Sequence, residues 1–351
     1  MDAWRDRRID MLTDAWSIGL LSCSMVTLFL SLIGVKTGWR IISFWDMDSG
    51  SELQIRLEEE VYLSAVLVEF GFAIQLLSVL MVVLAADYFS NILVGAMCAT
   101  GALTANSYGV PVLLVKLLSL FLSAAWIVCH KLDISSEYYP LVKTKYLLLF
   151  FILPLLVLDS TLLVLYLYNL KPDIITSCCG VLFSSQLNDG YNLLTVVPSS
   201  GLLALYGMLA LALSGITVKM TRHGDDVGAV SSYTAWAAIG LWLVFYFFSL
   251  LIVTVHTSPY IYAMPHHRCP FDLLTPPYTA VGYPLYFFLH GAVIAGISIS
   301  IGCLSEGRRG LAIPAARLRF WAGRLSLAFM AVFLLMVIYH PLIYQFRGGE
   351  G

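Results

Sequence analysis

Long apolar segments alternate with short polar ones along the whole chain. A helix rises 1.5 Å per residue, so about twenty apolar residues cross the roughly 30 Å hydrocarbon core of a bilayer. The pattern predicts an all-α membrane protein with nine transmembrane helices, at about residues 15–35, 61–86, 92–106, 110–130, 146–168, 200–220, 233–256, 279–303 and 322–344. The third segment is short for a span, and a re-entrant or tilted piece is the alternative there. We expect one polytopic domain over residues 1–351.

Composition supports this class and excludes others. The 351 residues are 59% hydrophobic and 12% charged, with a formal net charge of -2. A soluble domain carries about twice that charged fraction. The charges are dispersed rather than gathered into basic runs, so we expect no nucleic-acid partner and expect membrane lipid to be the main surroundings.

The loops differ in positive charge, which predicts an orientation. With the N-terminus in the cytoplasm, thirteen Lys and Arg fall on the cytoplasmic side, and six (Lys36, Arg40, Arg56, Lys171, Arg268 and Arg347) fall outside. This satisfies the positive-inside rule and places the C-terminus outside. If the third span were removed while the N-terminus stayed inside, the later basic loops would move outward, so the count favours nine spans. A bacterial cytoplasmic (inner) membrane is the expected location.

Three outer loops are long enough to form an exposed cap: residues 36–60, 169–199 and 257–278. In the first, Ser51 and Gln54 form a capping-box pattern, and helical spacing continues from there into the second span. The sequence therefore predicts a helix that begins at about residue 51, outside the bilayer, and runs directly into the membrane.

The second and third outer loops contain the candidate site residues, Cys178, Cys179, His266, His267, Cys269 and Asp272. Thiolate and imidazole are the usual ligands of zinc and copper, and adjacent thiols can also form a strained disulfide or pair with another loop. The alternatives are packed loop cysteines and imidazoles that hydrogen-bond water and lipid in the headgroup region. We expect a metal site only if the two loops meet.

Glu69, Lys116 and Asp159 are acidic or basic residues that lie well inside predicted spans, away from their ends, where a charge costs about 2.5–3.5 kcal/mol on the insertion scale. Glu69, Lys116 and Asp159 all fall in the outer halves of their spans under the predicted orientation. They could form a neutralised network or a proton relay, with a structural ion pair as the alternative. His290 is near a span centre, but no helix carries the two spaced His residues that stacked haems need, so haem is not favoured.

Several segments resemble a family of multi-pass membrane proteins of anaerobic and metal-reducing bacteria. They are FWDMDSGSELQIRLEEEVYL, GAMCATGALTANSYG, KPDIITSCCGVLF, HHRCPFDLL and VGYPLY, of which the SCCG and CPF parts are the most specific. The family's CPFC motif is similar to the CPxC of membrane disulfide-generating oxidoreductases, and Asp272 replaces its second Cys here. The resemblance implies topology and important loops, and it leaves Cys269 to pair with Cys178 or Cys179 or to bind metal beside Asp272.

The leading hypothesis is an extracytoplasmic Cys/His site that binds or hands on a soft metal, copper or zinc, to an extracytoplasmic metalloprotein. One alternative is a quinone-linked thiol–disulfide oxidoreductase that uses Cys178, Cys179 and Cys269. Another is a structural membrane subunit of a respiratory complex, whose partners are the other subunits of that complex. The sequence contains no Walker motif, no GxGxxG after a strand, no HExxH and no GxSxG, so nucleotide hydrolysis and serine-type hydrolysis have no support, and enzymatic activity is left open.

Overall fold

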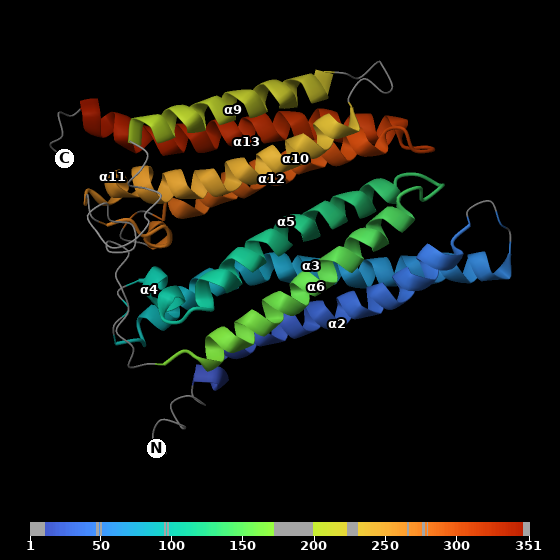
Figure 1. The fold of residues 1–351 in the computed structure, drawn as a ribbon, viewed down its shortest axis with the longest axis horizontal. Coiled ribbons are helices and arrows are strands. Elements are labelled where there is room, and N and C mark those ends of the chain that lie inside the picture. The colour runs from blue at the N-terminus through green and yellow to red at the C-terminus, as the bar shows by residue number, and fades with distance from the viewer. Residues whose placement is uncertain are drawn as a thin grey trace. The chain divides into compact units, whose positions relative to one another are not determined.

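The structure is a computed structural model that describes residues 11–46, 49, 51–94, 96, 98–171, 199–222, 231–264, 267–275, 278 and 280–346. All regular elements in these residues are helical (Figure 1). Eight helices are long and apolar enough to cross a membrane. The chain is therefore a multi-pass helical membrane protein.

The helices belong to two compact units. Unit 1 comprises residues 1–176 and 308–314, and unit 2 comprises residues 177–307 and 315–351. The helices of unit 1 are α2 (Ala15–Phe44), α3 (Glu52–Ser90), α4 (Ala99–Thr104), α5 (Gly109–Asp133) and α6 (Val142–Tyr168). The elements of unit 2 are α9 (Ser199–Arg222), α10 (Ser232–Ile252), η1 (Val253–Thr257), α11 (Ser258–Tyr262), η2 (Asp272–Leu274), α12 (Gly282–Ser305) and α13 (Ala312–Phe346). The expectation of one domain stays a prediction.

Eight of the nine predicted spans are confirmed as long helices, and the third is not. Over residues 92–106 the described part of the chain contains turns and the six-residue helix α4. Fifteen helical residues would reach only about 22 Å, well short of the hydrocarbon thickness. The side-chain amide of Asn106 donates to the Tyr166 carbonyl oxygen at 3.0 Å, and its oxygen accepts the Tyr108 N–H at 3.0 Å. These bonds fix a turn before α5.

The first predicted loop, 36–60, is mostly helix. α2 continues to Phe44 and α3 begins at Glu52, so the connection shortens to residues 45–51. The predicted cap is confirmed, because the Ser51 hydroxyl oxygen accepts the Gln54 N–H at 3.3 Å. A single helix then runs from this cap to Ser90. α2 and α3 thus form a long hairpin.

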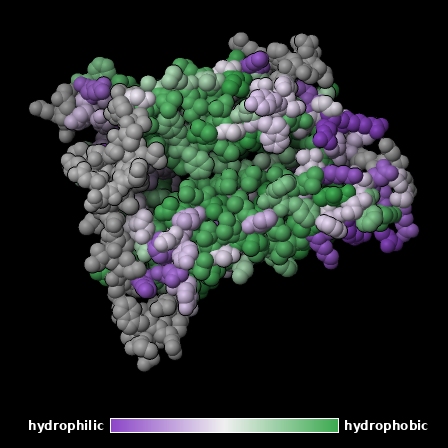
Figure 2. All heavy atoms as spheres, in the orientation of Figure 1, coloured by the Kyte–Doolittle hydropathy of each residue, from purple (hydrophilic) through white to green (hydrophobic). Residues whose placement is uncertain are grey.

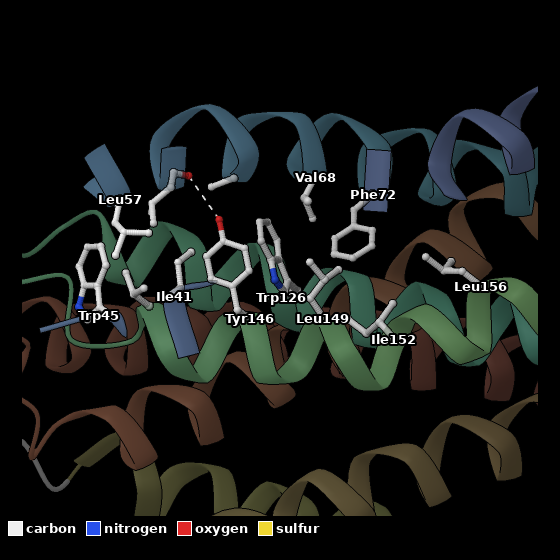
Figure 3. Close-up of a cluster of buried hydrophobic side chains, with 13 residues drawn as sticks. Ile41, Trp45, Leu57, Val68, Phe72, Trp126, Tyr146, Leu149, Ile152 and Leu156 are labelled. Carbon is white, nitrogen blue, oxygen red and sulfur yellow. Dashed lines mark hydrogen bonds between the residues drawn. The ribbon is translucent and has the colours of Figure 1, made fainter. Parts of the chain in front are cut away.

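Small residues bring α2 close to its neighbours in unit 1. A Cβ added at Gly34 would lie 2.3 Å from a Val68 methyl carbon, and one at Gly38 would lie 2.8 Å from the Tyr146 ring. In lipid there is no hydrophobic driving force between helices, so the van der Waals contacts that this close approach allows stabilise the helix packing instead. Figure 3 shows the resulting core, in which Tyr146 lies among apolar side chains and its hydroxyl is 3.4 Å from the Val61 carbonyl oxygen.

The lipid-facing character of the helices is visible on the surface. Figure 2 shows hydrophobic residues along the length of the helices in each unit, with hydrophilic residues gathered near helix ends. Large apolar side chains such as Phe29, Phe70 and Phe151 are more than 60% exposed. Exposed apolar belts of this kind suit a bilayer and would be unstable in water.

Gly296 in α12 provides a test of the packing in unit 2. A Cβ at this position would lie 2.2 Å from the Trp242 ring of α10. Gly296→Ala is therefore expected to lower the free energy of unfolding by about 1–3 kcal/mol. The control is Gly240→Ala in α10, where no atom lies within 4 Å of the new methyl group. Unfolding in detergent should show a loss for the first variant and none for the second; equal stability of the two would contradict this packing.

Candidate functional site

The loop over residues 257–278, predicted to be the third outer loop, brings three of the predicted site residues together in unit 2. The Cys269 thiol donates to Asp272 Oδ1 at 3.2 Å, and Asp272 Oδ2 lies 2.7 Å from His267 Nε2. Cys269 is fully buried, whereas the Asp272 and His267 side chains are 15% and 24% exposed. We refer to Cys269, Asp272 and His267 as the Cys–Asp–His cluster.

The local fold of the loop follows from its sequence. α10 loosens into the π-helical turn η1 just before Pro259, which lacks the N–H that a continuous α-helix would use. α11 then ends at Ala263, which adopts a left-handed conformation with φ 53° and turns the chain back. This turn directs residues 267–275 back beneath the end of α11.

Tyrosine hydroxyl groups hold the loop against the helices of unit 2. Tyr262 of α11 donates to the Cys269 carbonyl oxygen, and Tyr286 of α12 donates to the Pro270 carbonyl oxygen at 2.7 Å. The Tyr262 ring also meets the His267 ring edge to face, with centroids 4.6 Å apart. Both ends of the Cys269–Pro270 backbone are therefore fixed, and the Cys269 sulfur is held beside Asp272.

Close backbone contact completes the support. A Cβ at Gly282, the first residue of α12, would lie 2.8 Å from the Leu273 carbonyl carbon. Only glycine allows the start of α12 to approach η2 this closely. The position of Asp272, at the first residue of η2, therefore depends on Gly282.

The order of groups in the cluster limits its chemistry. The carboxylate lies between the thiol and the imidazole, and both of its oxygens are engaged. A cysteine nucleophile needs the imidazole beside its sulfur as the base, whereas here the Asp272 carboxylate lies beside the sulfur. A thiol and an imidazole that converge on one carboxylate supply sulfur, nitrogen and oxygen donors, and this set suits metal binding better.

His290 has a structural role in unit 2. Its Nδ1 lies 2.7 Å from the Tyr286 carbonyl oxygen, and its Nε2 lies 2.9 Å from the Tyr246 hydroxyl. Both ring nitrogens are thus occupied by protein groups. This arrangement agrees with the expectation that His290 is not a haem ligand, which stays a prediction.

Three other predicted site residues, Cys178, Cys179 and His266, lie outside the described residues. The predicted meeting of the second and third loops therefore stays a prediction.

Unit 1 contains a second candidate site within the membrane-spanning helices. Lys116 of α5 and Asp159 of α6 form an ion pair with 2.9 Å between Nζ and Oδ2, and their side chains are 0% and 1% exposed. Gln75 of α3 donates to the same Asp159 oxygen at 2.9 Å and to Ser119 at 2.7 Å. Lys116 also donates to Ser78 at 3.3 Å.

Glu69 does not join this pair. Its carboxylate contacts Lys131 Nζ at 2.6 Å and lies 3.7 Å from His130 Nε2, at the C-terminal end of α5. α3 and α5 run in opposite directions because residues 92–106 do not form a long helix between them. The first half of α3 therefore lies beside the last turns of α5. The predicted three-residue network is replaced by two separate groups.

A further buried ion pair escaped prediction. Lys145 Nζ lies 2.7 Å from Asp133 Oδ2, with side chains 1% and 0% exposed, and 3.3 Å from His130 Nδ1. The Trp126 ring stacks on His130, and its indole N–H donates to the Lys145 carbonyl oxygen at 2.9 Å. The available signal was the i, i+3 spacing of His130 and Asp133, which places both on the same face of α5 as Lys116.

No family model matches this chain, and searches of curated proteins and of solved structures also give no match. The resemblance to proteins with SCCG and CPF loop motifs stays a prediction.

Proposed function

We propose that the protein binds a copper or zinc ion through Cys269, Asp272 and His267 and hands it on outside the cytoplasm. The observation that carries this proposal is the convergence of the thiol and the imidazole on the Asp272 carboxylate, at 3.2 and 2.7 Å. Hydrogen-bonded, partly buried donors of three kinds are the components of a transition-metal site.

The distances suit a site that closes around an ion. Metal–ligand bonds of about 2.0–2.3 Å in tetrahedral geometry separate the ligand atoms by about 3.4 Å. The Cys269–Asp272 and Asp272–His267 contacts each need to widen by less than about 1 Å, and the thiol and the imidazole, which bond different oxygens of the carboxylate, must also approach each other. The thiol must lose its proton first, so metal binding is coupled to proton release. A carboxylate beside one thiolate favours zinc or Cu(II), and a further thiol from Cys178 or Cys179 would shift the preference toward Cu(I).

The exposed fractions also suit transfer of the ion. His267 and Asp272 reach the surface, whereas Cys269 is buried beneath them. An incoming partner can thus reach the imidazole and the carboxylate before the thiolate. A recipient metalloprotein outside the cytoplasm fits this arrangement, and quinone-linked thiol–disulfide exchange is the alternative if Cys178 or Cys179 pairs with Cys269.

We further propose eight spans with both termini outside the cytoplasm, in a bacterial inner membrane. With this arrangement, the cytoplasmic side holds the connections 45–51, 134–141, 223–231 and 306–311, and the third outer loop stays outside. Thirteen Lys and Arg then lie on or near the cytoplasmic side and six outside, which supports this orientation. The Cys–Asp–His cluster faces the extracytoplasmic side.

Metal analysis tests the proposed site. The protein, purified in detergent, is loaded separately with Zn²⁺ or with Cu²⁺, desalted and analysed by mass spectrometry for bound metal. About one ion per chain is expected for one of these metals, with at least a tenfold loss of affinity in Cys269→Ser because the thiolate is the strongest donor. Asp272→Asn should weaken binding through its lost charge.

The matched control is Cys303→Ser, which removes a thiol of α12 in the same unit. It should bind as much metal as the unchanged protein. A variant with Cys178→Ser, Cys179→Ser and Cys269→Ser, compared with Cys269→Ser alone, shows whether the second loop adds ligands. The proposal fails if the unchanged protein takes up no metal, or if Cys269→Ser binds as well as Cys303→Ser.

A further inference from the structure

The two buried Lys–Asp pairs of unit 1 differ in one respect. In the Lys145–Asp133 pair, both carboxylate oxygens are bonded, because Asp133 Oδ1 accepts the Leu141 N–H at 2.7 Å and Oδ2 faces Lys145. In the Lys116–Asp159 pair, Oδ2 receives both Lys116 and Gln75. Asp159 Oδ1 is buried and has no hydrogen-bond partner in the described part of the chain.

An orphaned carboxylate oxygen inside a membrane bundle is costly. Leaving such an acceptor without a donor costs about 1–3 kcal/mol, and more for a charged group. A purely structural ion pair would be expected to satisfy both oxygens, as Asp133 does. Asp159 instead keeps one oxygen available to receive a proton.

Polar residues continue from this pair along one face of α5. Lys116, Ser119, Ser123, His130 and Asp133 are all buried and follow helical spacing, with Trp126 between them on the same face. From Lys116 to Asp133, α5 rises by about 26 Å, close to the roughly 30 Å hydrocarbon thickness. Buried polar stripes of this length are expensive in lipid and mark ion or proton paths.

Unpaired buried serines are not confined to this stripe. Within the described residues, the Ser123 hydroxyl is buried without a hydrogen-bond partner, but so are those of Ser24 and Ser31 on the closely packed face of α2. The distinctive features are the orphaned carboxylate oxygen and its position at one end of a charged stripe that ends at His130, Lys145 and Asp133.

We propose that unit 1 conducts protons across the membrane, with Asp159 as the proton-binding residue and the His130–Lys145–Asp133 group as the exchange point at the other end. A proton binds Asp159 Oδ1 to give the neutral acid, and Lys116 releases one proton through Ser78, whose hydroxyl oxygen accepts from its Nζ, and leaves a neutral amine. Transfer of the carboxylic proton to that amine restores the ion pair. One proton has then crossed, and both residues are unchanged.

The charged surroundings of Asp159 are simple. Among the described residues of unit 1, Lys116 is the one charged group within ion-pair distance of Asp159. α4 has no charged residue, and Glu69 of α3 is directed to Lys131. On α2, Gly34 faces Leu149 of α6, which lies ten residues, or about 15 Å, before Asp159 along α6. Lys36 and Arg40 follow Gly34 in the direction away from Asp159, so they are farther away still. Lys116 is therefore the charged group that acts most directly on Asp159.

Proton flux into liposomes tests this proposal. The full-length protein is reconstituted in liposomes that contain a pH-sensitive dye, and a potassium gradient with valinomycin supplies the driving potential. The unchanged protein is expected to raise the rate of internal acidification at least tenfold over empty liposomes. Asp159→Asn should reduce this rate to the rate of empty liposomes.

Asp159→Asn leaves Lys116 unpaired and could impair folding, so a second variant is needed. Lys116→Met with Asp159→Leu removes both charges and should fold while conducting no protons. The matched control is Glu306→Gln, which breaks a buried ion pair with Arg319 in unit 2 and should keep the full rate. Infrared difference spectra between acidic and alkaline buffer should also lose one carboxylic-acid band in the folded double variant.

The outcomes are distinct. Flux in the unchanged protein and in Glu306→Gln, together with its loss in the double variant, supports the path through Asp159. A rate in the unchanged protein equal to that of empty liposomes overturns the proposal, as does a double variant that conducts normally. The metal-binding proposal concerns unit 2 and is unaffected by either result.

Discussion

Replacing Lys116 with methionine is expected to destabilise the protein by about 3–5 kcal/mol, because the Asp159 carboxylate would remain buried without its cation. The ion pair is almost completely hidden, at 0% and 1% exposure, and Gln75 cannot neutralise the charge that Lys116 now balances. Reversible unfolding in detergent, followed by circular dichroism, measures the loss.

The double variant with Lys116→Met and Asp159→Leu should recover most of that stability. Replacing both members of a buried pair with apolar side chains removes the desolvation cost together with the attraction, and the result is often neutral. Arg40→Met provides the control. Arg40 pairs with Glu60 at 2.5 Å, but the two side chains are 42% and 38% exposed, so a loss below about 1 kcal/mol is expected. Equal losses for Lys116→Met and Arg40→Met would contradict the buried electrostatic role.

Hydropathy predicted most of the fold because membrane helices must satisfy all backbone hydrogen bonds internally. Eight apolar segments became helices, and α3 starts at its expected Ser51 cap, whereas α2 ends nine residues later and α13 starts ten residues earlier than the apolar segments indicated. The segment at 92–106 is apolar enough for a span, but as a helix its fifteen residues would be too short to cross the hydrocarbon core. Hydrophobicity alone does not separate a short buried segment from a span, whereas length does.

The candidate sites were only partly predictable for a related reason. The Cys–Asp–His cluster is local, because residues 267, 269 and 272 lie within six consecutive residues. The sequence alone was therefore enough to group them as one candidate site. The intramembrane pairs depend on helix direction. Counting 92–106 as a span made α3 and α5 parallel and placed Glu69 beside Lys116. In the antiparallel arrangement, Glu69 contacts Lys131 instead.

The predicted span at 146–168 leaves Lys145 in the polar segment before it, among the cations of the cytoplasmic side. Its burial depends on Asp133, which lies across the turn between α5 and α6. No pattern of charge along the chain distinguishes a cation that faces water from one that folds back onto a buried partner. The serine, histidine and aspartate positions on α5 contained the relevant signal, because their three- and four-residue spacing defines one face.

The positive-inside count could not decide between eight and nine spans. With eight spans and the N-terminus outside, Arg5, Arg7 and Arg8 leave the cytoplasmic side. Three other cations, Lys36, Arg40 and Arg56, take their place there. Thirteen positive residues remain inside in either case, so the earlier preference for nine came from holding the N-terminus fixed. Later loops keep the same side in both arrangements, and the location of the Cys–Asp–His cluster does not depend on the choice.

Labelling of the connection 45–51 separates the two topologies completely. We expect Ser49→Cys to be protected from a membrane-impermeant maleimide in intact cells and labelled after permeabilisation, because eight spans place this connection in the cytoplasm. Glu137→Cys, between α5 and α6, is the cytoplasmic reference, and Met264→Cys, at the end of α11, is the outer reference. Each variant is made in a background whose native cysteines are replaced by serine, so that the introduced cysteine is the one that is labelled.

Labelling of Ser49→Cys in intact cells at the level of Met264→Cys would require another crossing between α3 and α5, and would make α3 parallel to α5. The contacts of Glu69 with Lys131 and of Gln75 with Asp159 could not then coexist, so this experiment also tests the helix directions on which the proton path depends.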